Sequence, residues 1–448
     1  MNPTIQSYLK DHADEHVRDL QALLRFPSIA ARTDDIWRCA TWLADFMAGF
    51  GAPPELIADG GNPVLLAEMP GQSPKTLLIY LHYDVQPADE PDWLSDPFGG
   101  EVRDGRIYGR GAVDNKGPVM AVLEALRAYH ACGMQPPVTV RFLCEGEEEI
   151  SSPTLPGILG RYHDRIASDA LVNFDDNVWV DGRPRVVCGI KGIAKIRLEV
   201  RTRREFHAMM SPLIENAAWR LVWALNTLVA PDGRILIRDF YDEVVPPQPR
   251  DVALLADLGW SGDELLAASG RTAFVGGVSG TEVLTRLYLE PTINLGGISG
   301  GYVLPEQKGV VPAFAAAEMR VGTVPNQMPE RVLALIRAHL DAAGFGDVQA
   351  SLISRNPWAR TPVDSPIAQA LRKSLAGAFE RDVVLFPTYP GSGPEGVFQE
   401  LFPNMQQAYS GFGPTEDNLH APNEYIVIDD YLRGIETVVR LLEEYARV

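Results

Sequence analysis

The opening third of the 448-residue chain alternates between helix-like and strand-like patterns of apolar residues. Apolar positions recur at helical spacing from about residue 5 to residue 24. A second helix is expected at 116–132. Short apolar runs bounded by polar or turn residues predict buried strands at 76–81, 138–143 and 170–174. This alternation predicts an α/β fold in which helices cover both faces of a mostly parallel sheet.

The pattern changes after Gly192. It predicts strands at 194–200, 292–295, 313–321 and 348–353, and helices at 214–229 and 329–343. The order β-α-β-β-α-β is that of a small α+β domain of the ferredoxin-like, split βαβ type. From about residue 357 the pattern returns to helix, strand, Gly-rich turn and helix. We therefore expect a first domain in two parts, 1–193 and 357–448, with a second domain inserted at 194–356.

Polar and acidic residues follow each of the three strands predicted in the first domain. His82 and Asp84 follow the first strand, and four carboxylates in five positions, from Glu145 to Glu149, follow the second. The run Asp175-Asp176-Asn177 follows the third. Open α/β sheets place their binding sites beyond the carboxyl ends of the strands, so these side chains are expected to converge.

The crowded carboxylates need a physical explanation. Like charges this close repel and raise one another's pKa unless a cation is near. A solvated acidic turn is the ordinary interpretation of such a run taken alone. Here the segment around His82 and the glycine-rich segment 109–117, which contains Asp114, can supply further ligands. The combination favours a metal site.

The composition and net charge exclude some classes of binding partner. Lys and Arg number 40 against 59 Asp and Glu, and the net charge of −19 argues against nucleic acid or an anionic membrane. No apolar run approaches the roughly 20 residues that cross a bilayer, and the first residues lack a basic region followed by an apolar one. We expect a cytoplasmic protein. The four cysteines have no C-x-x-C spacing, so neither a zinc ribbon nor a disulfide framework is indicated.

Seven segments, taken in order, resemble the motifs of one enzyme family. They are His82-Tyr-Asp84, Gly109-Arg-Gly-Ala-Val-Asp114-Asn-Lys-Gly117, Glu145-Gly-Glu-Glu148-Glu149, Asp175-Asp176-Asn177, His207, Gly391-Ser392-Gly393-Pro394 and His420-Ala-Pro-Asn-Glu424. Over nearly its whole length the chain resembles the dinuclear zinc peptidases that include carnosinases, bacterial dipeptidases, aminoacylases and glutamate carboxypeptidases.

The resemblance implies two divalent metal ions, with zinc expected and manganese or cobalt as alternatives. The implied ligands are His82, Asp114, Glu149, Asp176 and His420. Asp114 would span both ions, with His82 and Asp176 completing one site and Glu149 and His420 the other. Asp114 also fits the N-cap of the helix that follows, and both roles can hold at once. A cis peptide bond is implied between Asp114 and Asn115.

The resemblance also implies catalytic roles. Glu148 is expected to be the general base, which takes a proton from a metal-bridging water and passes it to the leaving amine. Asp84 lies two residues after His82 in an extended segment, so it can accept from the other imidazole nitrogen and fix the tautomer. Glu145 and Glu147 are expected to be solvated or structural.

His207 lies in the inserted domain. In related enzymes such a histidine donates to the developing oxyanion, often from the partner subunit of a dimer. The residues after it depart from the related pattern, and a surface histidine at a strand end is the alternative.

Substrate contacts are expected from the inserted domain and the Gly-rich turn. Gly391 and Ser392 lie in a turn that replaces the Gly-Gly-Ser-x-Pro turn of similar dipeptidases, which holds the terminal carboxylate of the substrate. A simple tight turn is the alternative. A second carboxylate contact is usually an arginine three residues before the proline of a Val-Pro-Asn-Gln turn, but that position is Gly322 here. Arg320, on the same face of the predicted strand, is expected to substitute.

These features predict metal-dependent hydrolysis of an amide bond in a small substrate with a free carboxylate, most readily a dipeptide. The alternative is an N-acyl amino acid deacylase with the same dinuclear centre. A non-catalytic metal-binding protein on this fold is a rival, against which the intact Glu148 counts. A two-metal phosphoesterase is disfavoured because no G-x-x-x-x-G-K-[ST] loop is present. A homodimer is expected through the inserted domain, which would also close over the substrate as a lid.

Overall fold

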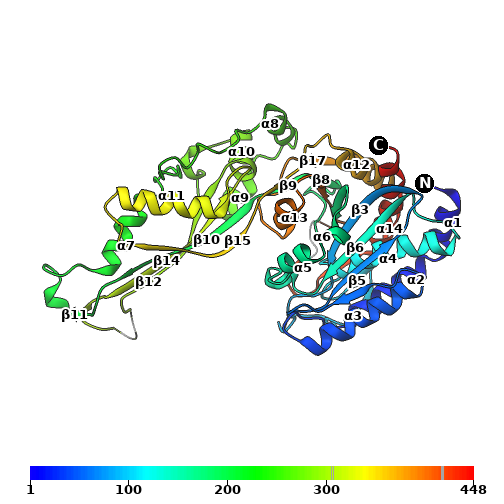
Figure 1. Cartoon of the computed structure of the whole chain (residues 1–448), viewed down its shortest axis with the longest axis horizontal. Coiled ribbons are helices and arrows are strands. Elements are labelled where there is room, and N and C mark those ends of the chain that lie inside the picture. Colours follow the sequence, from blue (N-terminus) through cyan, green and yellow to red (C-terminus); the bar gives the residue numbers. More distant parts are fainter. Residues whose placement is uncertain (304, 306, 415–417) are drawn as a thin grey trace. The chain divides into compact units, whose positions relative to one another are not determined.

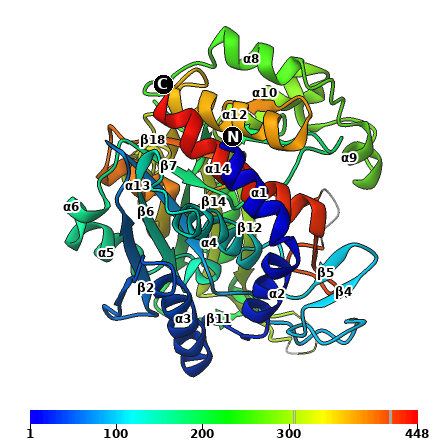
Figure 2. The ribbon, with the colours of Figure 1, turned by 90° about the vertical axis from the view of Figure 1, so that its right-hand side faces the viewer.

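The computed structural model describes residues 1–303, 305, 307–414 and 418–448 (Figures 1 and 2). The chain divides into two compact units. Unit 1 consists of Met1–Gly189, Thr361–Pro387 and Phe398–Val448, and unit 2 consists of Ile190–Arg360 and Thr388–Val397. Unit 2 therefore contains the segment expected as an insertion, together with a short segment from the Gly-rich turn.

Unit 1 is built on an eight-stranded sheet. The strand order is β1-β2-β6-β3-β7-β18-β8-β17. β6, β3, β7 and β18 run parallel to one another, as do β8 and β17, whereas β1, β2 and β6 pair antiparallel. The strands are β1 (Glu55–Ile57), β2 (Val64–Met69), β3 (Ser73–His82), β6 (Val138–Glu145), β7 (Ala170–Asn173), β8 (Arg185–Val187), β17 (Val384–Phe386) and β18 (Gln406–Tyr409). The α/β fold with a mostly parallel central sheet is thus confirmed.

Helices lie on both faces of this sheet (Figures 1 and 2). α4 and α14 pack on each other and on the central strands, and α12 packs on α14 and β18. The helices are α1 (Pro3–Asp11), α2 (Ala13–Leu24), α3 (Thr33–Ala48), α4 (Lys116–Ala131), α5 (Leu155–Arg161), α6 (His163–Ile166), α12 (Pro366–Phe379), α13 (Glu395–Leu401) and α14 (Ile428–Ala446). Within the described residues, no helix combines the length and apolar character needed to cross a membrane.

Unit 1 also contains a small three-stranded sheet, whose strands come from two distant segments of the chain. β19 (Tyr425–Val427) pairs antiparallel with β5 (Arg106–Tyr108), and β5 pairs with β4 (Glu101–Arg103). The segment before α4 and the segment before α14 are therefore held side by side. This pairing brings the residues just after β5 next to those just before β19.

The helix expected at 5–24 is two helices. α1 ends at Asp11, and α2 begins at Ala13. His12 lies between them with a non-helical backbone, and both its backbone N–H and its ring Nδ1 lie within hydrogen-bond distance of the Tyr8 carbonyl. The hydrophobic period continues through the break because both helices contribute residues to the same core.

Unit 2 contains an antiparallel sheet of order β12-β14-β10-β15. Its main elements are β10 (Gly192–Arg201), α7 (Ala217–Leu225), β12 (Thr292–Gly300), β14 (Phe314–Thr323), α11 (Pro329–Ala342) and β15 (Gln349–Asn356), in the β-α-β-β-α-β order expected. Alternate residues of β10 are buried, and α7 and α11 contribute to the same core. The 66-residue stretch between α7 and β12, for most of which no helix or strand was predicted, holds α8 (Pro249–Ala256), α9 (Asp263–Ala268) and α10 (Thr281–Leu289).

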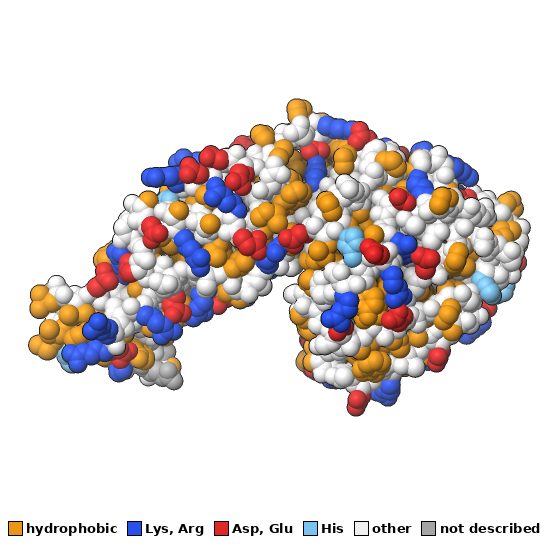
Figure 3. Space-filling view, viewed as in Figure 1, with side chains coloured by type: hydrophobic (Ala, Val, Ile, Leu, Met, Phe, Trp, Pro, Cys, Tyr) orange, Lys and Arg blue, Asp and Glu red, His pale blue; other side chains and the backbone are white. Residues whose placement is uncertain are grey.

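Unit 2 leaves several hydrophobic side chains exposed. Figure 3 shows them gathered at the end of the unit that carries β11 (Phe206–His207), which pairs with β13 (Val310–Val311). Met209 is 75% exposed and Leu213 is 78% exposed. On α7, Trp219 and Trp223 are more than half exposed, and their rings stack with centroids 5.9 Å apart.

The short segment Thr388–Val397 belongs to unit 2, and its backbone is hydrogen-bonded to the first residues of that unit. The backbone N–H of Lys191 donates to the carbonyls of Tyr389 and Gly391, each at 3.1 Å. Gly396 packs so closely on the Pro357 carbonyl that any side chain there would collide with it. The expected boundary at 357 therefore misses a return of the chain to unit 2.

A buried polar cluster joins α2 to α4 and gives a stability prediction. Glu124 and His16 are fully buried, with Glu124 Oε2 lying 2.8 Å from His16 Nδ1 and 2.6 Å from Arg127 Nη2. Arg127 keeps Asp19 and Glu15 as partners when Glu124 is removed, but the buried His16 loses its hydrogen-bond partner. Glu124→Ala is therefore expected to lower the free energy of unfolding by about 1–3 kcal/mol, the cost of an unsatisfied buried polar group. Chemical denaturation measures this. Glu101→Ala, which breaks an exposed pair with Arg103, is expected to change it by less than about 1 kcal/mol.

Candidate metal centre

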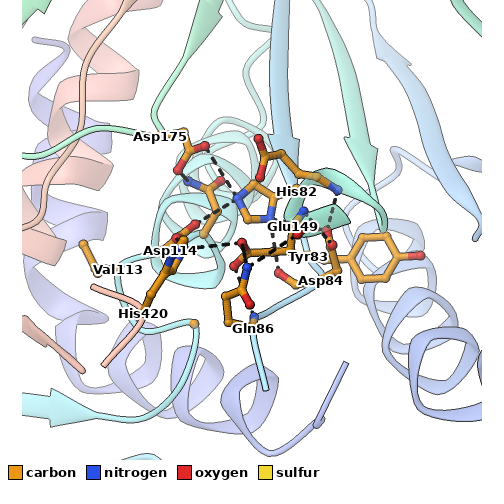
Figure 4. Close-up of polar contacts among 12 residues, drawn as sticks. His82, Tyr83, Asp84, Gln86, Val113, Asp114, Glu149, Asp175 and His420 are labelled. Atoms are coloured by element: carbon orange, nitrogen blue, oxygen red, sulfur yellow. Dashed lines mark hydrogen bonds and ion pairs between the residues drawn. The ribbon is translucent and has the colours of Figure 1, made fainter. Parts of the chain in front are cut away.

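Five side chains converge at the carboxyl edge of the central strands (Figure 4). His82 is the last residue of β3, Asp114 precedes α4, and Asp175 follows β7. Glu149 lies in a short 3₁₀ helix, Glu148–Ile150, directly after β6, and His420 lies in the loop before β19. Each side chain is therefore placed by the end of a regular element, as the sheet topology predicts.

Asp114 stands at the centre of this group. One of its carboxylate oxygens, Oδ1, lies 3.0 Å from Nε2 of His82, and the other, Oδ2, lies 2.8 Å from Nε2 of His420. His82 Nε2 is also 3.6 Å from Oδ2 of Asp175, and His420 Nε2 is 3.3 Å from Oε2 of Glu149. The result is two triads of potential ligand atoms, His82-Asp114-Asp175 and Asp114-Glu149-His420, which share Asp114.

Asp175 occupies the position that the sequence interpretation gave to Asp176. The carboxylate of Asp176 instead pairs with Arg185 and accepts from the backbone N–H of Asn177 at 2.9 Å. Consecutive residues of an extended segment point to opposite sides, so only one of the two aspartates can face His82. The structure therefore brings Asp175, and not Asp176, toward His82. The side chain of Asn115 donates to Oδ1 of Asp175 at 3.0 Å and fixes its orientation.

The cluster of carboxylates strongly favours positive charge. Burial disfavours the protonated form of His82, but Asp175, Asp114 and Asp84 outweigh burial and raise its pKa well above the ordinary value. Hydrogen bonds to Asp114 and Glu149 raise the pKa of His420 to about 10. Burial alone would raise the pKa of Asp114, yet His420 and His82 hold it below its usual range. Either protons on the imidazoles or metal cations can supply the charge that these carboxylates require.

Asp84 links His82 to the acidic segment. Nδ1 of His82 lies 3.1 Å from the backbone carbonyl of Asp84 and 3.4 Å from its Oδ1. The Asp84 carboxylate, which is fully buried, accepts from the backbone N–H groups of Glu148 at 3.2 Å and Glu149 at 3.0 Å. Asp84 therefore sets the imidazole orientation and the position of the 3₁₀ helix together, leaving Nε2 of His82 directed at Asp114.

The acidic run divides into different environments. Glu145 is buried and accepts from the hydroxyls of Tyr80 at 2.5 Å and Ser152 at 2.9 Å, and burial raises its pKa to about 7. Glu147 is buried and accepts from the backbone N–H of Asn62 at 3.0 Å. Of the two expectations for Glu145 and Glu147, the structural one therefore holds.

Glu148 has the environment of a proton acceptor. Burial is the largest cause that raises its pKa well above the ordinary value. The positive charge of His82 opposes this shift, while the negative charges of Asp175, Asp114 and Glu149 add to it. A carboxylate so placed takes up a proton more readily than one in water, which is the property that a general base near neutral pH requires.

The donor set fits a pair of divalent cations. The ligand atoms of each triad lie within 4.8 Å of one another, and they are imidazole nitrogens and carboxylate oxygens, which zinc and its neighbours accept. The buried Nε2 of His82 has no hydrogen bond of good geometry from the described residues. It faces the carboxylates of Asp114 and Asp175, as a nitrogen that shares a cation with them would. The cis peptide bond expected between Asp114 and Asn115 is present.

Gln86 supports Glu149 and was not singled out from the sequence. Its backbone N–H donates to Oε1 of Glu149 at 3.2 Å, and its side-chain amide donates to Oε2 at 2.8 Å (Figure 4). The signal was its position four residues after His82, in the segment that follows β3. Because an amide can hold a carboxylate without competing for a cation, Gln86 orients this ligand.

The other predicted site residues lie in unit 2. His207 is exposed on β11, and its Nδ1 accepts from the backbone N–H of Met209 at 3.2 Å. Ser392 is exposed, and the carbonyl of Gly391 accepts from the Lys191 backbone N–H. Arg320 is exposed on β14, opposite Lys195 and Asn294. It lines a hollow of about 420 Å³ on the sheet, together with Lys195 and Arg197.

Comparisons with known proteins agree with this geometry. The model of peptidase family M20/M25/M40 matches residues 78–444. A Beta-Ala-His dipeptidase from Rattus norvegicus is 27% identical over 98% of this chain and 95% of its own length. A Cys-Gly metallodipeptidase, dug1, from Schizosaccharomyces pombe is 28% identical over 88% of this chain and 83% of its own length.

A solved structure extends the likeness to the whole fold. An M20 family metallo-carboxypeptidase, Sso-CP2, from Sulfolobus solfataricus has 32% sequence identity and a TM-score of 0.87, covering 97% of this chain and 100% of that one. Family match, fold and converging ligand atoms all lead to the same result. This chain belongs to the M20/M25/M40 family of peptidases.

Proposed function

We propose that this chain is a dinuclear metallohydrolase that cleaves the amide bond of a small substrate with a free carboxylate, in the first place a dipeptide. The observation that carries the proposal is the pair of triads sharing Asp114, with the half-buried carboxylate of Glu148 close enough to feel the charges of His82, Asp114 and Glu149. Relatives named as dipeptidases cover almost the whole chain, which supports a dipeptide as substrate.

His82 and Asp175 would hold one ion, Glu149 and His420 the other, and Asp114 would bridge both. Zinc is the proposed metal, with manganese or cobalt as alternatives that the same donors accept. Two such ions, when bound, lower the pKa of a coordinated water and polarise the carbonyl that is attacked.

The protein side of the reaction is proton transfer and orientation. Glu148 would accept the proton from the attacking water and later give it to the amine that leaves, because its burial favours the protonated form. Asp84 keeps the Nδ1 side of His82 engaged, so that Nε2 faces the centre. Gln86 keeps both oxygens of Glu149 in place. Each of these contacts lies within unit 1.

Unit 2 would supply the groups that recognise the substrate. We assign the terminal carboxylate to the turn at Gly391 and Ser392 and to Arg320, and the developing oxyanion to His207. The hollow beside Arg320 carries two further cations, Lys195 and Arg197, against one carboxylate, Glu318. Its positive balance suits a carboxylate.

A substrate panel tests the proposal. The metal-loaded chain is given unblocked dipeptides, N-acyl amino acids, and longer peptides with a free carboxyl end, and the released amino acid is measured. Preference for dipeptides is the expected result. Preference for N-acyl amino acids would show a deacylase in place of a dipeptidase. Preference for longer peptides would show a carboxypeptidase, which is the second candidate because of the likeness to the Sulfolobus enzyme. No hydrolysis of any class would favour the non-catalytic rival.

We further propose that the enzyme is a cytoplasmic homodimer formed through unit 2. The exposed apolar side chains of Met209, Leu213, Trp219 and Trp223 support such an interface, because patches of this kind mark contact sites. The four cysteines are free thiols, which suits a reducing compartment. Light scattering of the wild-type chain and of a Trp219→Glu, Trp223→Glu variant tests the dimer. A monomeric wild type would contradict it.

A further inference from the structure

A buried ion pair beside the metal centre takes no part in the two triads. It joins Arg110, just after β5, to Glu424, just before β19. Both side chains are 1% exposed, and Nη1 of Arg110 donates to Oε2 of Glu424 at 3.0 Å. A buried pair of this kind is weak support for stability in general, so its other contacts decide what it does.

The Glu424 carboxylate is enclosed by the backbone of the segment that ends in Asp114. Its oxygens accept the backbone N–H of Gly111 at 3.1 Å, of Val113 at 3.0 Å and of Asp114 itself at 3.2 Å. Gly111 has a φ of +91°, and a side chain there would collide with Val85. The loop is therefore wrapped around one carboxylate, which fixes the backbone of the residue common to both triads.

Arg110 also contacts the two segments that carry the histidines. Nη2 donates at 3.2 Å to the carbonyl of Pro87, which follows His82 along the chain. Nη1 also lies 3.5 Å from the carbonyl of Ala421, directly after His420. One guanidinium and one carboxylate thus contact the segments that carry His82, Asp114 and His420, although these are remote from one another in sequence.

We propose that the Arg110–Glu424 pair is the positioning element of the metal centre, which sets the spacing of the Asp114 carboxylate relative to both imidazoles. Glu424 acts through the backbone of Asp114 and touches neither metal nor substrate. Loss of its charge frees the 109–114 loop and leaves Arg110 with the partly exposed Glu90, whose Oε1 lies 3.6 Å from Nη2, as its remaining counter-ion among the described residues. The inference rests on the metal-binding part of the proposed function and does not depend on which amide is hydrolysed.

The test compares metal binding by Glu424→Gln with that of the wild type. Zn²⁺ affinity of the metal-free full chain is measured by competition with a chromophoric chelator, and the site geometry by the visible absorption of bound Co²⁺. Because partners outside the ligand set typically contribute 10–100-fold to metal affinity, Glu424→Gln is expected to raise the Zn²⁺ Kd by about 10–100-fold and to change the Co²⁺ spectrum.

Glu124→Gln is the matched control. Glu124 is also fully buried and paired with an arginine in unit 1, but its partners His16 and Arg127 are not ligands of the centre. We expect this variant to lose thermal stability while its Zn²⁺ Kd stays within about twofold and its Co²⁺ spectrum is unchanged. This separates positioning from a general loss of stability.

Arg110→Lys is a second variant that tests the positioning role if Glu424→Gln does not fold. Lysine retains the charge but has no planar fork, so it cannot contact Glu424, Pro87 and Ala421 together, and a weaker Zn²⁺ affinity is expected. A folded Glu424→Gln or Arg110→Lys with wild-type Kd and Co²⁺ spectrum would overturn the inference. A wild-type chain that binds none of Zn²⁺, Mn²⁺ and Co²⁺ would instead overturn the proposed function.

Discussion

Glu148→Gln is expected to lower kcat for dipeptide hydrolysis by about 10²–10⁴-fold, the range that a positioned general acid–base group contributes. The amide keeps the shape of the side chain but cannot accept a proton from water or return one to the leaving amine. Because Glu149 and the other four proposed ligands remain, metal content should not change. Steady-state kinetics and elemental analysis of the same preparations measure the two effects.

Glu147→Gln is the matched control for this experiment. Glu147 is the preceding residue, yet its carboxylate accepts from the backbone N–H groups of Asn62 and Thr154, neither of which is a ligand. Thermal stability is expected to fall in this variant while kcat stays within a few-fold of wild type. Equal kcat for Glu148→Gln and the wild type would remove Glu148 from the reaction and favour the non-catalytic rival.

Asp175→Asn is expected to weaken strongly the binding of one of the two ions. Asp175 faces His82 and Asp114, and an amide oxygen is a much weaker ligand than a carboxylate. The Zn²⁺ Kd of the affected site should rise by more than the roughly 10–100-fold that loss of an outer partner causes, and hydrolysis should fall with occupancy. Calorimetric titration of the metal-free chain gives both the number of ions and their affinities.

Asp176→Asn makes the comparison sharp because the two aspartates are neighbours. The carboxylate of Asp176 pairs with Arg185, so its loss should reduce stability and leave two ions bound with wild-type affinity. If Asp176→Asn lost an ion and Asp175→Asn did not, the ligand set drawn from the geometry would be refuted.

The exchange between Asp175 and Asp176 shows where the sequence stops being informative. Both follow β7, and both are aspartates in a motif of the family. Which of them faces His82 depends on the side to which the extended chain turns after the strand, and that is set by contacts of later segments. Gly411 packs against the backbone of Asp176, and Arg185 comes from β8. None of these contacts is local in sequence.

His82, Asp114, Glu149 and His420 were predicted as ligands because each lies in a motif with several fixed positions, and the structure brings their side chains together. His82 ends a strand and Asp114 precedes a helix, whereas His420 lies in a loop. The strands and helices of both units were predictable for a similar reason. β3 and β6 are short apolar runs, and β10 alternates strictly between buried and half-buried residues. Such patterns arise because one or both faces of the strand are buried, and the order of apolar and polar residue types is enough to show this.

Supporting contacts were harder to predict. Glu424 ends the motif that begins at His420, but its neighbours in sequence do not indicate that its carboxylate is enclosed by backbone N–H groups more than 300 residues away in sequence. The helices α8, α9 and α10 were missed because turn signals such as Pro231-Asp-Gly-Arg dominate the segment around them. The break at His12 was missed because the hydrophobic period runs through it.

The most direct test measures metal content and hydrolysis together. The purified full chain is stripped with a chelator, returned to Zn²⁺ in steps, and assayed on a dipeptide after each addition, with bound metal counted by elemental analysis. We predict that hydrolysis is lost on stripping and reaches its plateau when two ions per chain are bound. Dipeptide hydrolysis that persists at full rate in metal-free protein, or a plateau reached with no bound metal, would contradict the account.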